Sequence, residues 1–157
     1  MGKSKNFDFI AYTDGSCNNL SPYGEGGAAF IVLQDERQFA HRAKGFLNTT
    51  NNRMEMLAII SAVNSVPDGS SILVKTDSRI AITAFEKQRK NAANHDLIEL
   101  FAKVSQGKCV SFEWVKGHNG DKWNEFCDET ANSMREQIRI KNNIPIYDYK
   151  NSPKCNK

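Results

Sequence analysis

The sequence predicts an α/β fold in which helices cover both faces of a mixed five-stranded sheet. Two observations predict it: three strand-like runs follow one another near the start of the chain, and helix-like and strand-like segments alternate after them. Consecutive strands with short loops form an antiparallel meander, whereas strands separated by helices pair in parallel. We therefore expect three antiparallel strands followed by parallel ones.

The predicted meander opens the chain. Phe7–Thr13 is rich in aromatic and β-branched residues and ends at Asp14-Gly15, a turn signal. A loop with many Ser, Pro and Gly residues follows at Ser16–Gly26. Two apolar runs, Gly27–Leu33 and Phe39–Leu47, are joined by a short polar link. Links of this length are typical of hairpins, so we expect three neighbouring strands.

The middle of the chain alternates between helix and strand. From Asn51 the apolar residues occupy most sides of a helix, which is typical of a helix buried between layers. Pro67 ends this helix, and Ser71–Thr76 is a short strand without a polar face, suited to the interior of a sheet. Ser78–Lys90 and Asn94–Val104 are predicted to be two further helices.

The last elements are a fifth strand and a long amphipathic helix. Cys109–Val115 is the predicted strand, and the helix begins near Trp123. Apolar residues recur along this helix at steps of three and four, which indicates one face docked on the sheet. We expect one domain over residues 1–141. Residues 142–157 should form an irregular, loosely attached tail.

Composition restricts the class of protein. The 157 residues can bury one domain core, and no apolar run is long enough to cross a bilayer or to act as a secretory signal. We therefore expect a cytoplasmic monomer with no membrane partner. The four cysteines are scattered, which predicts reduced thiols rather than disulfides or a zinc site. A net charge of +3 permits a polyanionic partner without requiring one.

Four acidic residues are candidates for chemistry, although each has a structural explanation of its own. Asp14 precedes a glycine in a turn signal, and Glu55 follows Asn52 at the spacing of a capping box. Asp77 stands where helix N-caps are common, and Asp128 borders the apolar face of the last helix, where it could simply be solvated.

Together these acids predict a metal centre. Asp14 and Asp77 lie near the ends of strands that we expect to be neighbours, while Glu55 and Asp128 lie on helices packed against the sheet. Four converging carboxylates would repel one another unless cations lay between them. Hard divalent ions prefer oxygen ligands, and two of them about 4 Å apart catalyse phosphodiester hydrolysis.

His118 lies in the loop Lys116–Asp121, before the last helix. A lone histidine is often structural or merely exposed. Gly117 and Gly120 predict a mobile loop, and the following helix carries Asp128. We therefore expect His118 to handle protons or assist product release rather than to be a fixed ligand.

Five sequence strings carry a family resemblance: Tyr12–Cys17 (YTDGSC), Thr49–Glu55 (TTNNRME), Thr76–Ser78 (TDS), Trp114–Gly120 (WVKGHNG) and Asn124–Glu129 (NEFCDE). In this combination and order they resemble the type 1 ribonuclease H family, and the string TNNRME (Thr50–Glu55) is close to diagnostic. The resemblance runs from about Phe7 to about Met134, nearly the whole predicted domain.

The resemblance implies an endonuclease that hydrolyses the RNA strand of RNA/DNA hybrids and leaves 5′-phosphate and 3′-hydroxyl ends. Asp14, Glu55, Asp77 and Asp128 would hold two Mg²⁺ ions, with Mn²⁺ as a possible substitute. Asp14 would bridge both ions. His118 would assist proton transfer or product departure, which makes it the fifth catalytic residue.

The resemblance also implies where the substrate binds. Asn51 and Asn52 would contact the minor groove of the hybrid, and Thr50 would help to hold a phosphate of the DNA strand. Backbone N–H groups of Gly15, Ser16 and Cys17 would meet RNA sugars and phosphates, and Asn124 matches an asparagine of the family. Short polar side chains suit the reading of duplex shape and 2′-hydroxyls.

The chain departs from the family pattern in three places. Phe85–His95 is short and lacks tryptophan, whereas many bacterial members carry a basic, Trp-rich protrusion there. The three basic side chains of Phe85–His95 either substitute weakly for that protrusion or belong to a solvated helix end. Asn48 stands where members often have arginine, and the spacing of the first loop leaves open whether Asn18 or Asn19 contacts RNA.

Two other functions fit the same fold. A non-catalytic binding module would keep the fold without the metals, but the presence of all four acids and His118 argues against it. Resolvase-like and integrase-like nucleases share the architecture but lack the TNNRME string.

Overall fold

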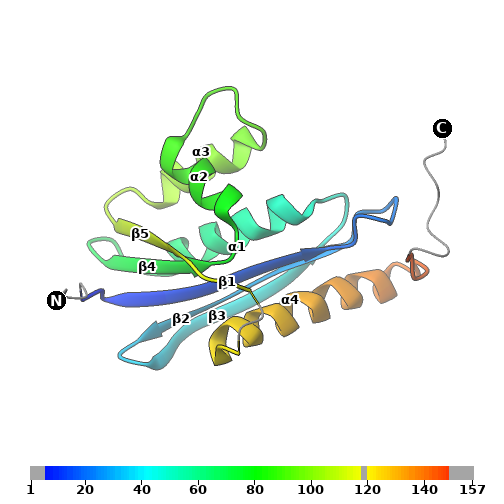
Figure 1. Ribbon diagram of the computed structural model, residues 1–157, viewed down its shortest axis with the longest axis horizontal. Coiled ribbons are helices and arrows are strands. Elements are labelled where there is room, and N and C mark those ends of the chain that lie inside the picture. Colours follow the sequence, from blue (N-terminus) through cyan, green and yellow to red (C-terminus); the bar gives the residue numbers. More distant parts are fainter. Residues whose placement is uncertain (1–5, 118–119, 149–157) are drawn as a thin grey trace.

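The computed structural model describes residues 6–117 and 120–148. The elements are β1 (Phe9–Cys17), β2 (Gly26–Gln34), β3 (Arg37–Phe46), α1 (Asn51–Asn64), β4 (Ser71–Thr76), α2 (Arg79–Lys87), α3 (His95–Val104), β5 (Cys109–Trp114) and α4 (Lys122–Lys141). The strands form one sheet in the order β3-β2-β1-β4-β5. Helix α4 covers one face, and the other three helices lie on the opposite face (Figure 1).

The pairing of the strands confirms the predicted mixed sheet. Strand β2 pairs antiparallel with β1 and β3, whereas β4 pairs in parallel with β1 and with β5. Only Asp35 and Glu36 separate β2 from β3, and both have positive φ. Two central residues of this kind form the tight hairpin turn whose twist matches that of the flanking strands.

Strand β1 is longer than predicted, and this corrects the assignment of Asp14-Gly15 to a turn. The strand continues to Cys17, with Asp14 opposite Ala29 and Gly15 opposite Ala28 of β2. The apolar residues at the start of β1 predict only the first half of the strand. The second half is polar, and it is held in the strand by pairing with β2. The other boundaries lie within a few residues of the prediction, as is usual at element ends.

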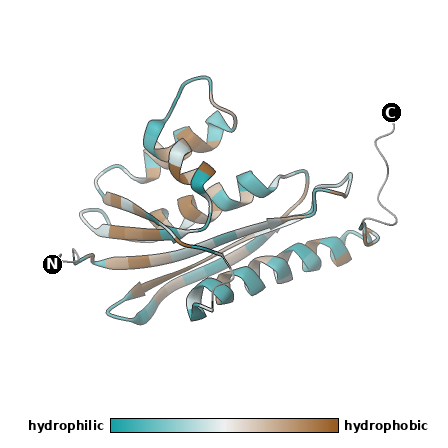
Figure 2. Ribbon diagram, viewed as in Figure 1, coloured by the Kyte–Doolittle hydropathy of each residue, from teal (hydrophilic) through white to brown (hydrophobic). Residues whose placement is uncertain are grey.

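Helix α1 is buried between the sheet and α3, as its apolar pattern predicts. Eight of its fourteen residues are buried, and it packs on β1 and β2 on one side and on α3 on the other. The rings of Phe85 and Phe101, from α2 and α3, stack with centroids 4.2 Å apart over Phe112 of β5. Figure 2 shows the hydrophobic residues along the strands and the hydrophilic ones over much of α4.

Helix α4 lies directly on the backbone of the sheet. A Cβ atom on Gly27 would come within 2.2 Å of the carbonyl oxygen of Ala131, so only glycine permits this approach. Cys127 and Ala131 of the predicted docking face are buried. In the described part of the chain, every helix is too short or too polar to traverse a lipid bilayer.

The described part of the tail, residues 142–148, has neither helix nor strand but contacts the domain. Ile144 is buried, and its carbonyl accepts a hydrogen bond from Arg139. The Asn18 amide donates to the carbonyl of Tyr147, whose ring lies beside Tyr23. This stretch is therefore not the loosely attached chain that its composition suggests, because apolar and amide contacts tie it to the loop between β1 and β2.

Candidate active site

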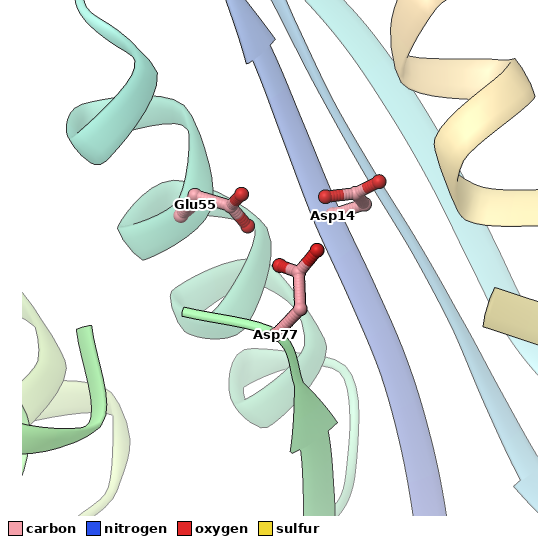
Figure 3. A group of neighbouring side chains, drawn as sticks. All are labelled: Asp14, Glu55 and Asp77. Carbon is pink, nitrogen blue, oxygen red and sulfur yellow. The ribbon is translucent and has the colours of Figure 1, made fainter. Parts of the chain in front are cut away.

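Three of the four predicted acids converge where β4 ends beside β1 (Figure 3). Asp14 comes from β1, Glu55 from α1 and Asp77 from the residue directly after β4. One carboxylate oxygen of each lies within 4.8 Å of the other two. Residues far apart in the sequence thus form a single acidic cluster, which we define as these three side chains.

The register of the sheet explains why Asp14 and Asp77 meet. Strands β1 and β4 run in parallel, and their last paired residues are Tyr12 and Lys75. Each aspartate stands two residues beyond that pair, so both lie at the carboxyl end of the parallel pairing. This is the convergence that the order of the elements predicts.

Gly15 explains how Glu55 joins them. A Cβ atom at Gly15 would come within 2.4 Å of the backbone nitrogen of Glu55 and 2.5 Å of the backbone carbon of Met54. Strand β1 and helix α1 are therefore in backbone contact at the position next to Asp14. Any larger residue would separate the two carboxylates that the glycine brings together.

The structural explanations of the individual acids do not hold. The N-cap of α1 is Thr50, whose hydroxyl accepts from the Arg53 N–H, so Glu55 lies beyond any capping box. The N-cap of α2 is Ser78 rather than Asp77. With no capping role to explain them, Glu55 and Asp77 stay available for chemistry.

Asp128 adjoins the cluster from α4. It is half-buried, and it raises the pKa of Asp14 through a side-chain hydrogen bond and through its charge. The Gly15 N–H donates to Asp14 Oδ1 at 2.9 Å and favours the ionised form. Asp14 is thus the member of the cluster that contacts a carboxylate from each side of the sheet.

The cluster is electrostatically unfavourable by itself. Burial raises the pKa of Glu55, and the charges of Asp14 and Asp77 raise it further. Burial is also the largest cause of the raised pKa of Asp14, followed by the charge of Asp77. The site therefore requires either protons or cations to be stable.

The donor set fits divalent cations with a preference for oxygen. All three clustered ligands are carboxylates, and Glu55 Oε1 is buried without a hydrogen-bond partner among the described residues. A buried, unpartnered carboxylate oxygen is costly unless it meets a proton or a metal. Mg²⁺ and Mn²⁺ suit such a site, whereas softer metals would favour nitrogen or sulfur ligands.

Two residues to which the sequence assigned no part in the site, Trp114 and Gly117, lie against Asp77. The Trp114 indole N–H donates to the backbone carbonyl of Asp77 at 3.1 Å. A Cβ atom at Gly117 would come within 2.7 Å of Asp77 Oδ2, so the chain after β5 packs against the carboxylate itself. Both residues lie within the string WVKGHNG. From the sequence, Gly117 is expected only to make the loop mobile.

The predicted minor-groove residues stand at the start of α1. Asn51 is half-buried and Asn52 is exposed, while Thr50 is exposed and caps the helix. Asn124 is only 6% exposed and lies one helical turn before Asp128 on α4. Because it is buried, Asn124 can contact a substrate only where a substrate group enters the acidic site beside Asp128.

The loop between β1 and β2 distinguishes the two candidate asparagines. The Asn18 side chain donates to Glu25 and to the carbonyl of Tyr147 and accepts from the Leu20 N–H. Asn19 is exposed. Asn18 is therefore committed to the fold, and Asn19 is the one available to a ligand.

The strand residues next to Asp14 are also partly committed to the fold. The hydroxyl of Ser16 donates to Asn132 and accepts from Arg135, both on α4. The thiol of Cys17 donates to the carbonyl of Thr49. His118, predicted to assist catalysis, lies outside the described residues.

The raised pKa values predict how pH affects the stability of metal-free protein. The folded chain keeps protons on Asp14 and Glu55 that the unfolded chain releases above about pH 4, so stability should fall as pH rises from there towards neutrality. The Glu55→Gln variant lacks one of these groups. Its melting temperature in EDTA should therefore exceed that of the wild type by a margin that grows with pH. A margin that is constant with pH would contradict the shifted pKa.

Comparisons with known proteins show the family and the fold of this chain. A family model described as RNase H matches residues 6–136. A ribonuclease HI of Synechocystis sp. is 34% identical over 134 residues, which cover 76% of this chain and 82% of that protein. A ribonuclease H of Desulforamulus reducens is 35% identical over 150 residues, which cover 85% of this chain and 91% of that protein. The N-terminal RNase H domain of a Mycobacterium tuberculosis protein has the same fold, with a TM-score of 0.74. The match covers 87% of this chain and 99% of that chain, and the two sequences are 16% identical.

Proposed function

Because the chain belongs to the RNase H family, we propose that it hydrolyses the RNA strand of RNA/DNA hybrids by a two-metal-ion mechanism. Family membership makes it a nuclease, a hydrolase of phosphodiester bonds. The proposal adds the mechanism and the end chemistry, which is 5′-phosphate and 3′-hydroxyl. One observation carries it: three carboxylates within 4.8 Å of one another, one of them with a buried and unpartnered oxygen.

The proposed ligands are Asp14, Glu55, Asp77 and Asp128, with Mg²⁺ as the ion and Mn²⁺ as a substitute. When bound, two such ions would orient the attacking water and stabilise the departing 3′ oxygen. Asp14, which interacts with both Glu55 and Asp128, would help to hold both ions. His118 would move the proton or help the product to leave.

Recognition of the hybrid would use short polar groups near the cluster. Asn51 and Asn52 would read the wide minor groove and its 2′-hydroxyls, because their amides both donate and accept. Thr50 would hold a phosphate of the DNA strand through its exposed hydroxyl. Asn19, together with backbone N–H groups of Ser16 and Cys17, would contact the RNA strand.

The chain would act as a cytoplasmic monomer. The three cysteines in the described residues are free thiols, which fits a reducing compartment. Residues 1–141 would be the nuclease domain. Residues 142–148 would serve mainly to hold the loop between β1 and β2, because the carbonyl of Tyr147 accepts from Asn18 and its ring lies beside Tyr23.

A cleavage assay tests the proposal. Hybrids labelled on either strand, duplex DNA and duplex RNA are incubated with Mg²⁺, Mn²⁺ or EDTA, and the product ends are identified. We expect cleavage of the RNA strand of the hybrid alone, dependent on metal and leaving a 5′-phosphate. Intact RNA with either metal would favour the non-catalytic binding module, and cleavage of duplex DNA would favour a resolvase-like nuclease.

A further inference from the structure

A groove of about 1170 Å³ lies on the face of the sheet that α4 covers only in part. Helix α4 packs on β1, β2 and β3, whereas Leu73 of β4 and Ser111 of β5 line the groove. Among the described residues, no helix lies over β4 and β5 on this side, because α1, α2 and α3 occupy the opposite face (Figure 1). Parallel strands are normally covered on both faces. This half of the sheet therefore lacks the covering that parallel strands usually have.

The floor of the groove is apolar at its centre. The parallel register aligns Ile10, Leu73 and Ser111 across β1, β4 and β5. Ile10 and Leu73 are only half-buried, and Trp123, which is also half-buried, lines the groove from α4. An exposed apolar surface that is bounded by polar residues is typical of a docking site.

The charged residues of the groove are mainly acidic. Asp8, Asp35, Glu36 and Glu113 line it, and all four are exposed. In the part of the chain that the structure describes, none of the four forms an ion pair. The chain as a whole carries a net charge of +3, so the negative groove is a local feature. Its potential repels nucleic acid and attracts a cationic partner.

Two lysines also line the groove, but they are directed at aromatic rings. The Lys75 ammonium lies 5.3 Å from the centroid of the Tyr12 ring, and that of Lys122 lies 4.6 Å from the centroid of the Trp123 ring. Each ammonium is attracted by the face of its ring rather than paired with a carboxylate. Four acids against two lysines leave the groove negative.

The uncovered strip of sheet has the width of a helix. Neighbouring strands lie about 4.8 Å apart, so β4 and β5 together present a strip about 10 Å wide. An α-helix with its side chains has a diameter of about 10–12 Å. One helix placed beside α4 would therefore complete this layer of the fold.

We propose that this groove docks an amphipathic helix of a protein partner. The apolar stripe of the helix packs on Ile10 and Leu73, and its lysines and arginines face the acids that line the groove. The docked helix leaves the acidic cluster open, because none of the three clustered acids lines the groove. The inference concerns a surface separate from the proposed active site, so it does not depend on the cleavage reaction.

Opposite charges at one position test the docking surface. The probe is a labelled peptide of about 18 residues, with leucine at helical steps of three and four and lysine elsewhere. Its binding to Ser111→Glu, wild-type and Ser111→Lys proteins is followed by fluorescence anisotropy. We expect Ser111→Glu to bind about three- to tenfold more tightly than wild type and Ser111→Lys to bind more weakly by a similar factor. Equal affinities would overturn the proposal.

A second comparison leaves the floor of the groove unchanged. Asp35→Asn/Glu36→Gln removes two charges from the exposed hairpin, and the control Asp68→Asn/Glu86→Gln removes two exposed acids outside the groove. We expect only the hairpin variant to weaken binding, about three- to tenfold, with a difference that shrinks as salt is added. Equal weakening in the control would show that the peptide responds to net charge alone. Equal binding of a peptide with glutamate in place of lysine would also overturn the proposal.

Two other occupants of the groove would give different results. If Lys3→Gln/Lys5→Gln tightens peptide binding as much as Ser111→Glu does, the chain's own segment 1–5 competes for the groove and the assignment to a partner is wrong. If sedimentation shows a dimer that Ser111→Lys dissociates, the groove joins two copies of this chain, and the assignment is equally wrong. We expect neither result, and we expect hybrid cleavage to be the same in wild type and in every groove variant.

Discussion

The Asp77→Asn variant should lose hybrid cleavage by about three orders of magnitude or more while its fold becomes more stable in metal-free buffer. The activity is lost because the amide replaces one of three clustered carboxylates with a weak metal ligand. The loss should exceed that caused by removing a single oxyanion-hole donor, about 10²–10³. The stability rises because the variant removes one negative charge from a cluster in which Asp77 raises the pKa of both neighbours.

The stability gain can be measured by thermal unfolding in EDTA. Relief of repulsion in a partly buried cluster is worth about 1–3 kcal/mol, and each kcal/mol corresponds to roughly 2–4 °C for a chain of this size. Asp68→Asn is the matched control, because Asp68 is exposed in the connection from α1 to β4. It should change neither activity nor stability. A lower melting temperature for Asp77→Asn in EDTA would show that the acids do not repel one another.

The sequence predicts the architecture because its signals are local. The hairpin link at Asp35, the helical period from Asn51 and the apolar run of β4 each depend on neighbouring residues. Together they determine the order of the elements and the mixed pairing of the sheet. The convergence of Asp14 and Asp77 follows from that order, because β1 and β4 are neighbouring parallel strands and each acid lies two residues beyond their last paired residues.

Contacts between distant residues were not predictable in this way. The continuation of β1 through Asp14-Gly15 depends on Ala28 and Ala29 across the ladder, and locally the dipeptide resembles a turn. The bond from Trp114 to Asp77 joins residues 37 positions apart. Hydrogen bonding of Asn18 to Tyr147 likewise spans 129 positions, so the sequence could not show which loop asparagine is free.

Two glycines near the acids should respond differently to the same substitution, and the contrast separates the fold from the site. At Gly15 an added Cβ meets backbone atoms of α1 at 2.4 and 2.5 Å, so β1 and α1 must separate. We expect Gly15→Ala to cost about 3 kcal/mol, a fall of roughly 6–12 °C in melting temperature, and to abolish most cleavage.

At Gly117 the added Cβ meets only Asp77 Oδ2 at close range, 2.7 Å away, and the next described atom is 3.6 Å away. A carboxylate can rotate away where a backbone cannot, so Gly117→Ala should keep the melting temperature within about 2 °C. The rotation misplaces the proposed metal ligand, so cleavage should fall about 10–100-fold and require more Mg²⁺. Thermal unfolding and Mg²⁺ titration of the cleavage rate measure both variants. If Gly117→Ala unfolds as easily as Gly15→Ala, or cleaves with unchanged Mg²⁺ dependence, Gly117 does not hold Asp77 in place.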